Sequence, residues 1–139
     1  MEKEYKSIRE EVFDWFEEAK ADLKRAIRSL NNNDYSLSCY MSQQAIEKAL
    51  KALIIGLKHK RPPHVHDLVV LYEYVRDLLP LPRDVIEKLP EVSQYYVTAR
   101  YPNAGLRRPS ISFSKLQADN ALEVAKYVIR KVEEILSTR

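Results

Sequence analysis

The stretch from Tyr35 to Lys58 constrains the fold of this chain more than any other, because nothing in it breaks a helix before Gly56 near its end. Asp34 and the asparagine run Asn31–Asn33 stand in front of it and supply helix-capping side chains. One set of large apolar residues and one set of small residues recur at steps of three and four, so each set lies along one helix face. The large set is Ile46, Leu50, Leu53 and Leu57, and the small set is Ala45, Ala49, Ala52 and Gly56.

The opposite side of this predicted helix is polar for most of its length and then becomes apolar. The polar side chains are Gln43, Gln44, Glu47, Lys48 and Lys51. Ile54 and Ile55 then follow on the same side. A helix that is apolar all round is buried all round, so its own bundle or a second subunit must cover this end. Because exposed isoleucines would favour association, we expect a homodimer with Ile55 in its interface.

The composition favours helices throughout the chain. Only two glycines occur among 139 residues, and 31% of the residues are charged. The absence of a long uncharged apolar run argues against a membrane-spanning helix, and the charged N-terminus argues against a secretory signal. We therefore expect one all-α domain over residues 1–139, located in the cytoplasm and without contact to a membrane. A net charge of +3 is too small to indicate a nucleic-acid partner by itself.

The apolar periodicity and the prolines predict the remaining elements. We expect an up-and-down antiparallel bundle of four long helices plus a shorter helix. The long helices cover Ser7–Leu30, Tyr35–Lys58, Arg83–Ala99 and the segment from Ser114 to the C-terminus. His66 or Asp67 caps the shorter helix, which lies between the second and third of these. Pro90 interrupts or kinks the helix Arg83–Ala99, and Asn103–Phe113 forms a long loop. Ser114 and Gln117 have the spacing of a capping box.

Several kinds of chemistry are disfavoured by the residues present. The two glycines cannot build a phosphate-binding glycine loop, and no cysteine–histidine spacing fits zinc. His59, His64 and His66 cluster near Asp67, but a metal site needs more ligands, and helix capping explains His66 or Asp67 more simply. We expect no metal and no cofactor. Cys39 stands alone and predicts a small buried side chain.

Two segments combine basic and aromatic residues, which suits the phosphates and bases of nucleic acids or nucleotides. The first follows the central helix and holds Lys58, His59, Lys60 and Arg61. The second holds Tyr95, Tyr96, Arg100 and Tyr101, followed by Arg107 and Arg108. The alternative interpretation is a charged loop that keeps the bundle in solution, with Tyr95 or Tyr96 in the core.

Three segments in this order resemble the HEPN domain family: SCYMSQQAIEKALKALI, HDL at the start of the next helix, and YYVTARYPNA. The resemblance covers essentially the whole chain. It implies a helical bundle that is usually dimeric. Many members are small partners of a minimal nucleotidyltransferase, often as toxin and antitoxin. Other members bind nucleotides, and many are metal-independent ribonucleases.

The ribonuclease members carry an arginine that is followed after four to six residues by a histidine, and Arg100 resembles that arginine. No histidine follows Arg100 in this chain. The family's chemistry resembles general acid–base catalysis by that histidine, so we expect no catalytic residue here. The first hypothesis is a non-catalytic protein that binds a nucleotide or RNA phosphate and pairs with a minimal nucleotidyltransferase. Its candidate binding residues are Gln44, Lys48, Lys51, His66, Tyr96, Arg100 and Tyr101, with the ammonium groups of Lys48 and Lys51 converging on one polyphosphate.

Two alternatives remain open. One is a ribonuclease with an altered site, in which folding brings Arg100 and His66 together. The other is a purely structural module that forms a dimer and binds no ligand.

Overall fold

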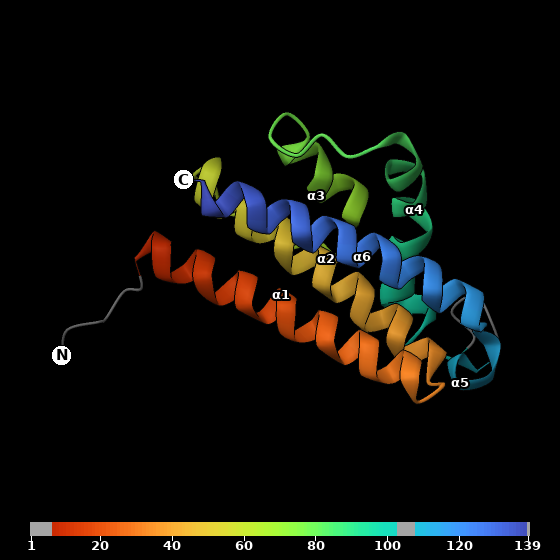
Figure 1. The fold of residues 1–139 in the computed structure, drawn as a ribbon. Helices are drawn as coiled ribbons and strands as arrows, with labels where there is room; N and C mark the ends of the chain where they lie inside the picture. Colours follow the sequence, from red (N-terminus) through yellow and green to blue (C-terminus); the bar gives the residue numbers. More distant parts are fainter. Residues whose placement is uncertain (1–6, 103–107, 139) are drawn as a thin grey trace.

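The computed structural model describes residues 7–102 and 108–138. In these residues the chain is all-helical, as predicted, and no strand is present. The helices are α1 (Ile8–Asn31), α2 (Tyr35–Leu57), α3 (Leu68–Val75), α4 (Arg83–Thr98), α5 (Pro109–Ser112) and α6 (Lys115–Ser137). Helices α1 and α2 lie side by side and run antiparallel, and α6 packs along both (Figure 1). Helices α3 and α4 carry the chain back to the end from which α6 starts.

The side chains that cap α2, α3 and α6 are among those expected from the sequence, and Ser7 also caps α1. The Ser7 hydroxyl accepts a hydrogen bond from the Glu10 amide, and the Asp34 carboxylate accepts one from the Leu37 amide. Asp67, rather than His66, caps α3 by accepting from the amides of Val69 and Val70. Ser114 and Gln117 form the complete capping box of α6. Each cap satisfies amides that the first helical turn leaves without a partner, which fixes where each helix begins.

The small-residue stripe of α2 lets neighbouring helices approach closely, as predicted. Ala45, Ala49 and Ala52 are fully buried. A Cβ atom added to Gly56 would lie 3.1 Å from Cγ2 of Val12 on α1, so α1 crosses α2 directly over this glycine. Further along, the Ser38 hydroxyl of α2 donates to the Ala26 carbonyl of α1 at 2.8 Å. The two helices therefore pack closely toward both ends of α2.

The structure corrects three expectations. Ile54 and Ile55 are buried by the bundle itself, with exposed fractions of 0% and 4%, so the expectation that Ile55 lies in a dimer interface is wrong. Helix α4 continues through Pro90, which is exposed, so of the two predicted alternatives, an interruption or a kink, the interruption is wrong. The segment predicted as a loop contains α5, and residues 103–107 of that segment lie outside the described part. In the described residues no helix is long and apolar enough to cross a membrane.

Cys39 lies in the bundle core with no exposed surface. Burial, helped by the negative charge of Glu91, raises the pKa of its thiol to about 12.

Since the thiolate is the nucleophile, the folded protein should resist alkylation of Cys39 by iodoacetamide at pH 8, and the urea-unfolded chain should react fully. Mass spectrometry of the two samples measures this difference. Rapid labelling of the folded protein would contradict the buried placement of Cys39.

Candidate functional site

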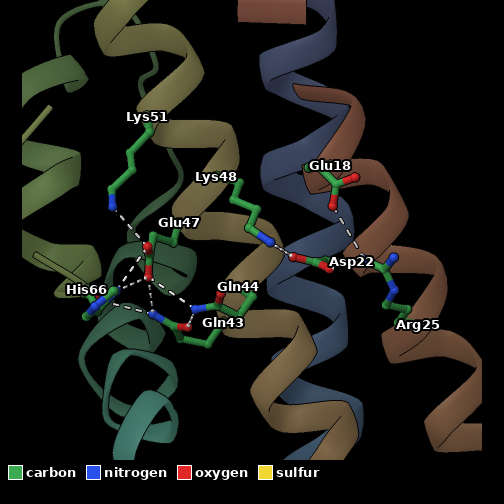
Figure 2. A network of polar contacts seen from close by, with 9 residues as sticks. All are labelled: Glu18, Asp22, Arg25, Gln43, Gln44, Glu47, Lys48, Lys51 and His66. Atoms are coloured by element: carbon green, nitrogen blue, oxygen red, sulfur yellow. Dashed lines mark hydrogen bonds and ion pairs between the residues drawn. The ribbon is translucent and has the colours of Figure 1, made fainter. Parts of the chain in front are cut away.

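A buried carboxylate on α2 gathers the polar side chains of one face of the molecule. The side chain of Glu47 is only 5% exposed. It accepts hydrogen bonds from Nε2 of Gln43 at 3.2 Å, from Nε2 of Gln44 at 3.3 Å and from Nζ of Lys51 at 3.0 Å. Nδ1 of His66 lies 3.0 and 3.1 Å from its two oxygens. Figure 2 shows these donors converging on Glu47 from α2 and from the segment before α3. We call these five residues the Glu47 network.

The Glu47 network fixes the orientation of His66. A carboxylate only accepts hydrogen bonds, so Nδ1 of His66 carries the hydrogen that faces Glu47. The second ring nitrogen, Nε2, is then the one left for other partners. Gln43 also donates to the backbone carbonyl of His66 at 2.9 Å, which ties the segment before α3 to α2. A carboxylate-oriented imidazole of this kind has the arrangement of a general base.

The His66 ring lies against a group of tyrosines that surrounds Arg100. His66 stacks on Tyr96 of α4 with ring centroids 3.7 Å apart and ring planes 10° from parallel. The Arg100 guanidinium carbon lies 5.1, 5.2 and 5.0 Å from the ring centres of Tyr40, Tyr96 and Tyr101. We call Tyr40, Tyr96, Arg100 and Tyr101 the tyrosine–arginine cluster. Ring faces attract a cation without neutralising it.

Two hollows flank this cluster. One of about 740 Å³ lies between α3 and α4 and is lined by His66 and Tyr96. The other, of about 470 Å³, lies between the starts of α2 and α5 and the end of α4. Its lining includes Tyr40, Arg100 and Arg108, with one carboxylate, Asp34. No carboxylate in the described residues forms an ion pair with Arg100, so its charge remains available to an anion.

The two lysines of α2 do not converge, and the expected geometry is wrong. Lys48 points toward α1, where its Nζ lies 2.5 Å from Oδ2 of Asp22 (Figure 2). Lys51 points into the Glu47 network instead (Figure 2), and its Nζ lies 5.6 Å from the centre of the Trp15 ring of α1. Asp22 is 1% exposed and also pairs with Arg25. Each lysine therefore neutralises a buried carboxylate, and the two ammonium groups do not share an anion.

The other predicted site residues are brought together. His66, Tyr96, Arg100 and Tyr101 form one continuous surface, and Gln44 and Lys51 reach it through Glu47. The candidate binding residues chosen from the sequence do not include Tyr40. Arg108 was named only as part of the second basic and aromatic segment. Tyr40 could have been found from spacing alone, because it precedes Gln44 by four residues and Glu47 by seven, which places all three on one face of α2.

No group of metal ligands accompanies this surface. Among residues 7–102 and 108–138, no three His, Cys, Asp or Glu side chains are grouped so that they could hold a metal ion. The carboxylate of Glu47 is already occupied by nitrogen donors. The groups that this surface does offer are a guanidinium for anion binding at Arg100 and an imidazole for proton transfer at His66.

The sequence of this chain is similar to a known protein family and to a known archaeal protein. The model of the HEPN domain matches residues 12–135. A protein of Methanocaldococcus jannaschii named "Putative toxin MJ1304" is 31% identical over 135 residues, which cover 87% of this chain and 85% of that protein.

Solved structures agree with that match. TT1696 from Thermus thermophilus has a TM-score of 0.78 and 31% identity, covering 89% of this chain and 97% of its own. ST0689, described as an archaeal HEPN homologue, has a TM-score of 0.71 and 26% identity, covering 88% of this chain and 95% of its own.

Removal of the Glu47 carboxylate tests whether the network holds the site together. In a Glu47→Ala variant the buried ammonium of Lys51 loses its counter-ion, so we expect the free energy of unfolding to fall by about 3–5 kcal/mol. Urea denaturation followed by circular dichroism measures the loss.

Glu87→Ala is the matched control. Glu87 makes an ion pair of the same 3.0 Å length with Arg83, but both side chains are exposed. Its loss should cost about 0–1 kcal/mol. Equal losses in the two variants would contradict a structural role for the Glu47 network.

Proposed function

Since the chain belongs to the HEPN domain family, we propose that it is a non-catalytic member that binds the phosphate of a nucleotide or of RNA. In this proposal it acts in the cytoplasm, as a homodimer, and as the partner of a minimal nucleotidyltransferase in a toxin–antitoxin-like module. The tyrosine–arginine cluster is the observation that supports ligand binding. Arg100 is exposed, lies among three tyrosine rings and has no carboxylate partner within the described residues.

The chemistry of the cluster suits a phosphorylated nucleoside. A guanidinium donates two parallel hydrogen bonds to phosphate oxygens, and tyrosine faces stack on a base. Arg100 and Arg108 line the same hollow of about 470 Å³, so two cations are available to one phosphate chain. Asp34 also lines this hollow, and its negative charge disfavours an anion beside it, so in this proposal the phosphates lie at the two arginines. The ammonium of Lys48 lies outside this proposal because Asp22 holds it.

The proposed partner rests on the family and on the name of the Methanocaldococcus jannaschii relative, which describes a toxin. A short nucleotidyltransferase gene beside the gene for this chain would support the pairing. Co-expression of the two proteins would then test it through co-purification. Separate elution of the two proteins would count against the proposed module.

Replacement of Arg100 tests the binding site. We expect Arg100→Ala to weaken binding of a nucleoside triphosphate about tenfold or more, because a charge-assisted pair to phosphate contributes roughly 1.5–3 kcal/mol. Isothermal titration calorimetry measures the affinity. Arg83→Ala, which removes an exposed arginine from the first turn of the same helix, is the matched control and should bind as the parent does.

Two results would count against this site. If the parent protein gives no binding heat with nucleotides or short RNA, the chain is a structural dimerisation module instead. If Arg83→Ala loses as much affinity as Arg100→Ala, binding follows overall charge and not the tyrosine–arginine cluster.

A metal-independent ribonuclease is a second candidate function, and the stacking of His66 on Tyr96 favours it. This contact brings His66 and Arg100 to the same tyrosine ring, although they come from different segments. Nε2 of His66, with Nδ1 held by Glu47, could accept the proton of a ribose 2′-hydroxyl while Arg100 binds the phosphate. This histidine would act in place of the one that does not follow Arg100.

Cleavage of labelled RNA by the purified protein, in the presence of a metal chelator, decides between the two functions. For a ribonuclease we expect His66→Ala to lower the rate by about 10²–10⁴-fold, the usual contribution of a general base. His64→Ala, in the same segment, should leave the rate unchanged. If the parent cleaves no RNA, the non-catalytic function is supported. If both variants cleave as fast as the parent, His66 is not the general base and this mechanism is wrong.

A further inference from the structure

The exposed face of α1 carries an aromatic side chain that the bundle does not use. Phe13 is 63% exposed, and Ile8 beside it is 54% exposed. Phe13 stands at the edge of a hollow of about 840 Å³ that runs between α1 and the C-terminal ends of α2 and α6. A second hollow of about 350 Å³ lies on its other side. An exposed aromatic ring next to an open apolar hollow is typical of a surface that another molecule covers.

The larger hollow is lined by apolar side chains and by charged side chains of both signs. Its apolar lining includes Val12 and Phe16 of α1, Leu57 of α2 and Leu136 of α6. Lys20 of α1 and Glu133 of α6, which form an ion pair at 3.5 Å, also line it. A hollow with this lining can accept an aromatic side chain that has charged neighbours of both signs.

The charges on α1 indicate which molecule fits. Arg9, Phe13 and Glu17 follow at steps of four residues, and all three are exposed, so they form one stripe along α1. In an antiparallel pair of identical helices that cross at Phe13, the residue four before Phe13 faces the residue four after it. Arg9 then faces the partner's Glu17, and Glu17 faces the partner's Arg9. The same stripe is thus complementary to itself across a twofold axis.

We propose that this α1 face is the homodimer interface, with the two α1 helices antiparallel and each Phe13 ring inserted in the hollow of the other copy. Two Arg9–Glu17 ion pairs flank the rings and fix the register. Glu17 already pairs with Lys20 at 2.6 Å on the surface, and its carboxylate has the capacity to accept from an arginine as well. The inference rests on the homodimer part of the proposed function and does not depend on the ligand of the tyrosine–arginine cluster.

A charge swap tests the register without disturbing the core. Sedimentation equilibrium at protein concentrations up to about 100 μM measures the dissociation constant of the dimer. We expect Arg9→Glu alone and Glu17→Arg alone each to weaken dimerisation roughly tenfold or more, because like charges then face each other twice. The double variant Arg9→Glu/Glu17→Arg should return to within roughly threefold of the parent, because opposite charges face each other again. Failure of the double variant to recover would overturn the antiparallel arrangement.

Phe13→Asp tests the surface itself and should give a monomer, with the circular dichroism spectrum of the parent. Leu116→Asp is the matched control, since Leu116 is 68% exposed at the start of α6 and lies outside this hollow. A parent protein that is monomeric at the highest concentration would overturn both the homodimer and this surface. A Phe13→Asp variant that remains a dimer would overturn the surface alone. Nucleotide binding by the monomeric variant, measured by calorimetry, shows separately whether the proposed function holds.

Discussion

The candidate site depends on the hydrogen bonds that the buried carboxylate of Glu47 accepts. A charge with 5% of its side chain exposed is stable only when donors surround it, and four side chains meet this need. Three of the donors come from α2 itself, and the fourth, His66, comes from the segment before α3. The requirement to satisfy one buried charge therefore sets the position of the chain between α2 and α3.

The position of His66 then determines what lies next to it. Its ring stacks on Tyr96, and Tyr96 shares Arg100 with Tyr40 and Tyr101. A sequence of contacts thus runs from a buried carboxylate to an exposed guanidinium, through an imidazole and a tyrosine ring. The inner part has its polar groups paired, while Arg100 in the outer part has no carboxylate partner in the described residues. A ligand-binding role for Arg100, as proposed, would use this division between a supporting interior and an unpaired surface cation.

The lysines of α2 show why a count of basic residues does not locate an anion site. Lys48 and Lys51 occupy one helix and are three residues apart, yet they serve two different carboxylates on opposite sides of α2. Both carboxylates are buried, so each holds its lysine more strongly than a solvated anion could. Arg100 stands apart from them because its neighbours are aromatic rings, which attract a cation and leave its charge uncompensated.

The sequence by itself determined the five longer helices, α1, α2, α3, α4 and α6, because periodicity, caps and prolines act within a few residues along the chain. Ser7, Asp34, Asp67 and the Ser114–Gln117 box begin the helices where local rules place them. The motif order also indicated the family and directed attention to Arg100 and Tyr96. Only the tertiary structure decided which charged and polar side chains pair. Lys48 pairs with Asp22, which is 26 residues away in the sequence, and His66 pairs with Glu47, which is 19 residues away. The same folding buried Ile55 inside the chain and left Phe13 outside, and the composition of the two helices could not distinguish these outcomes. Pairing between side chains far apart in the sequence depends on how the helices pack in space, which local sequence patterns do not specify.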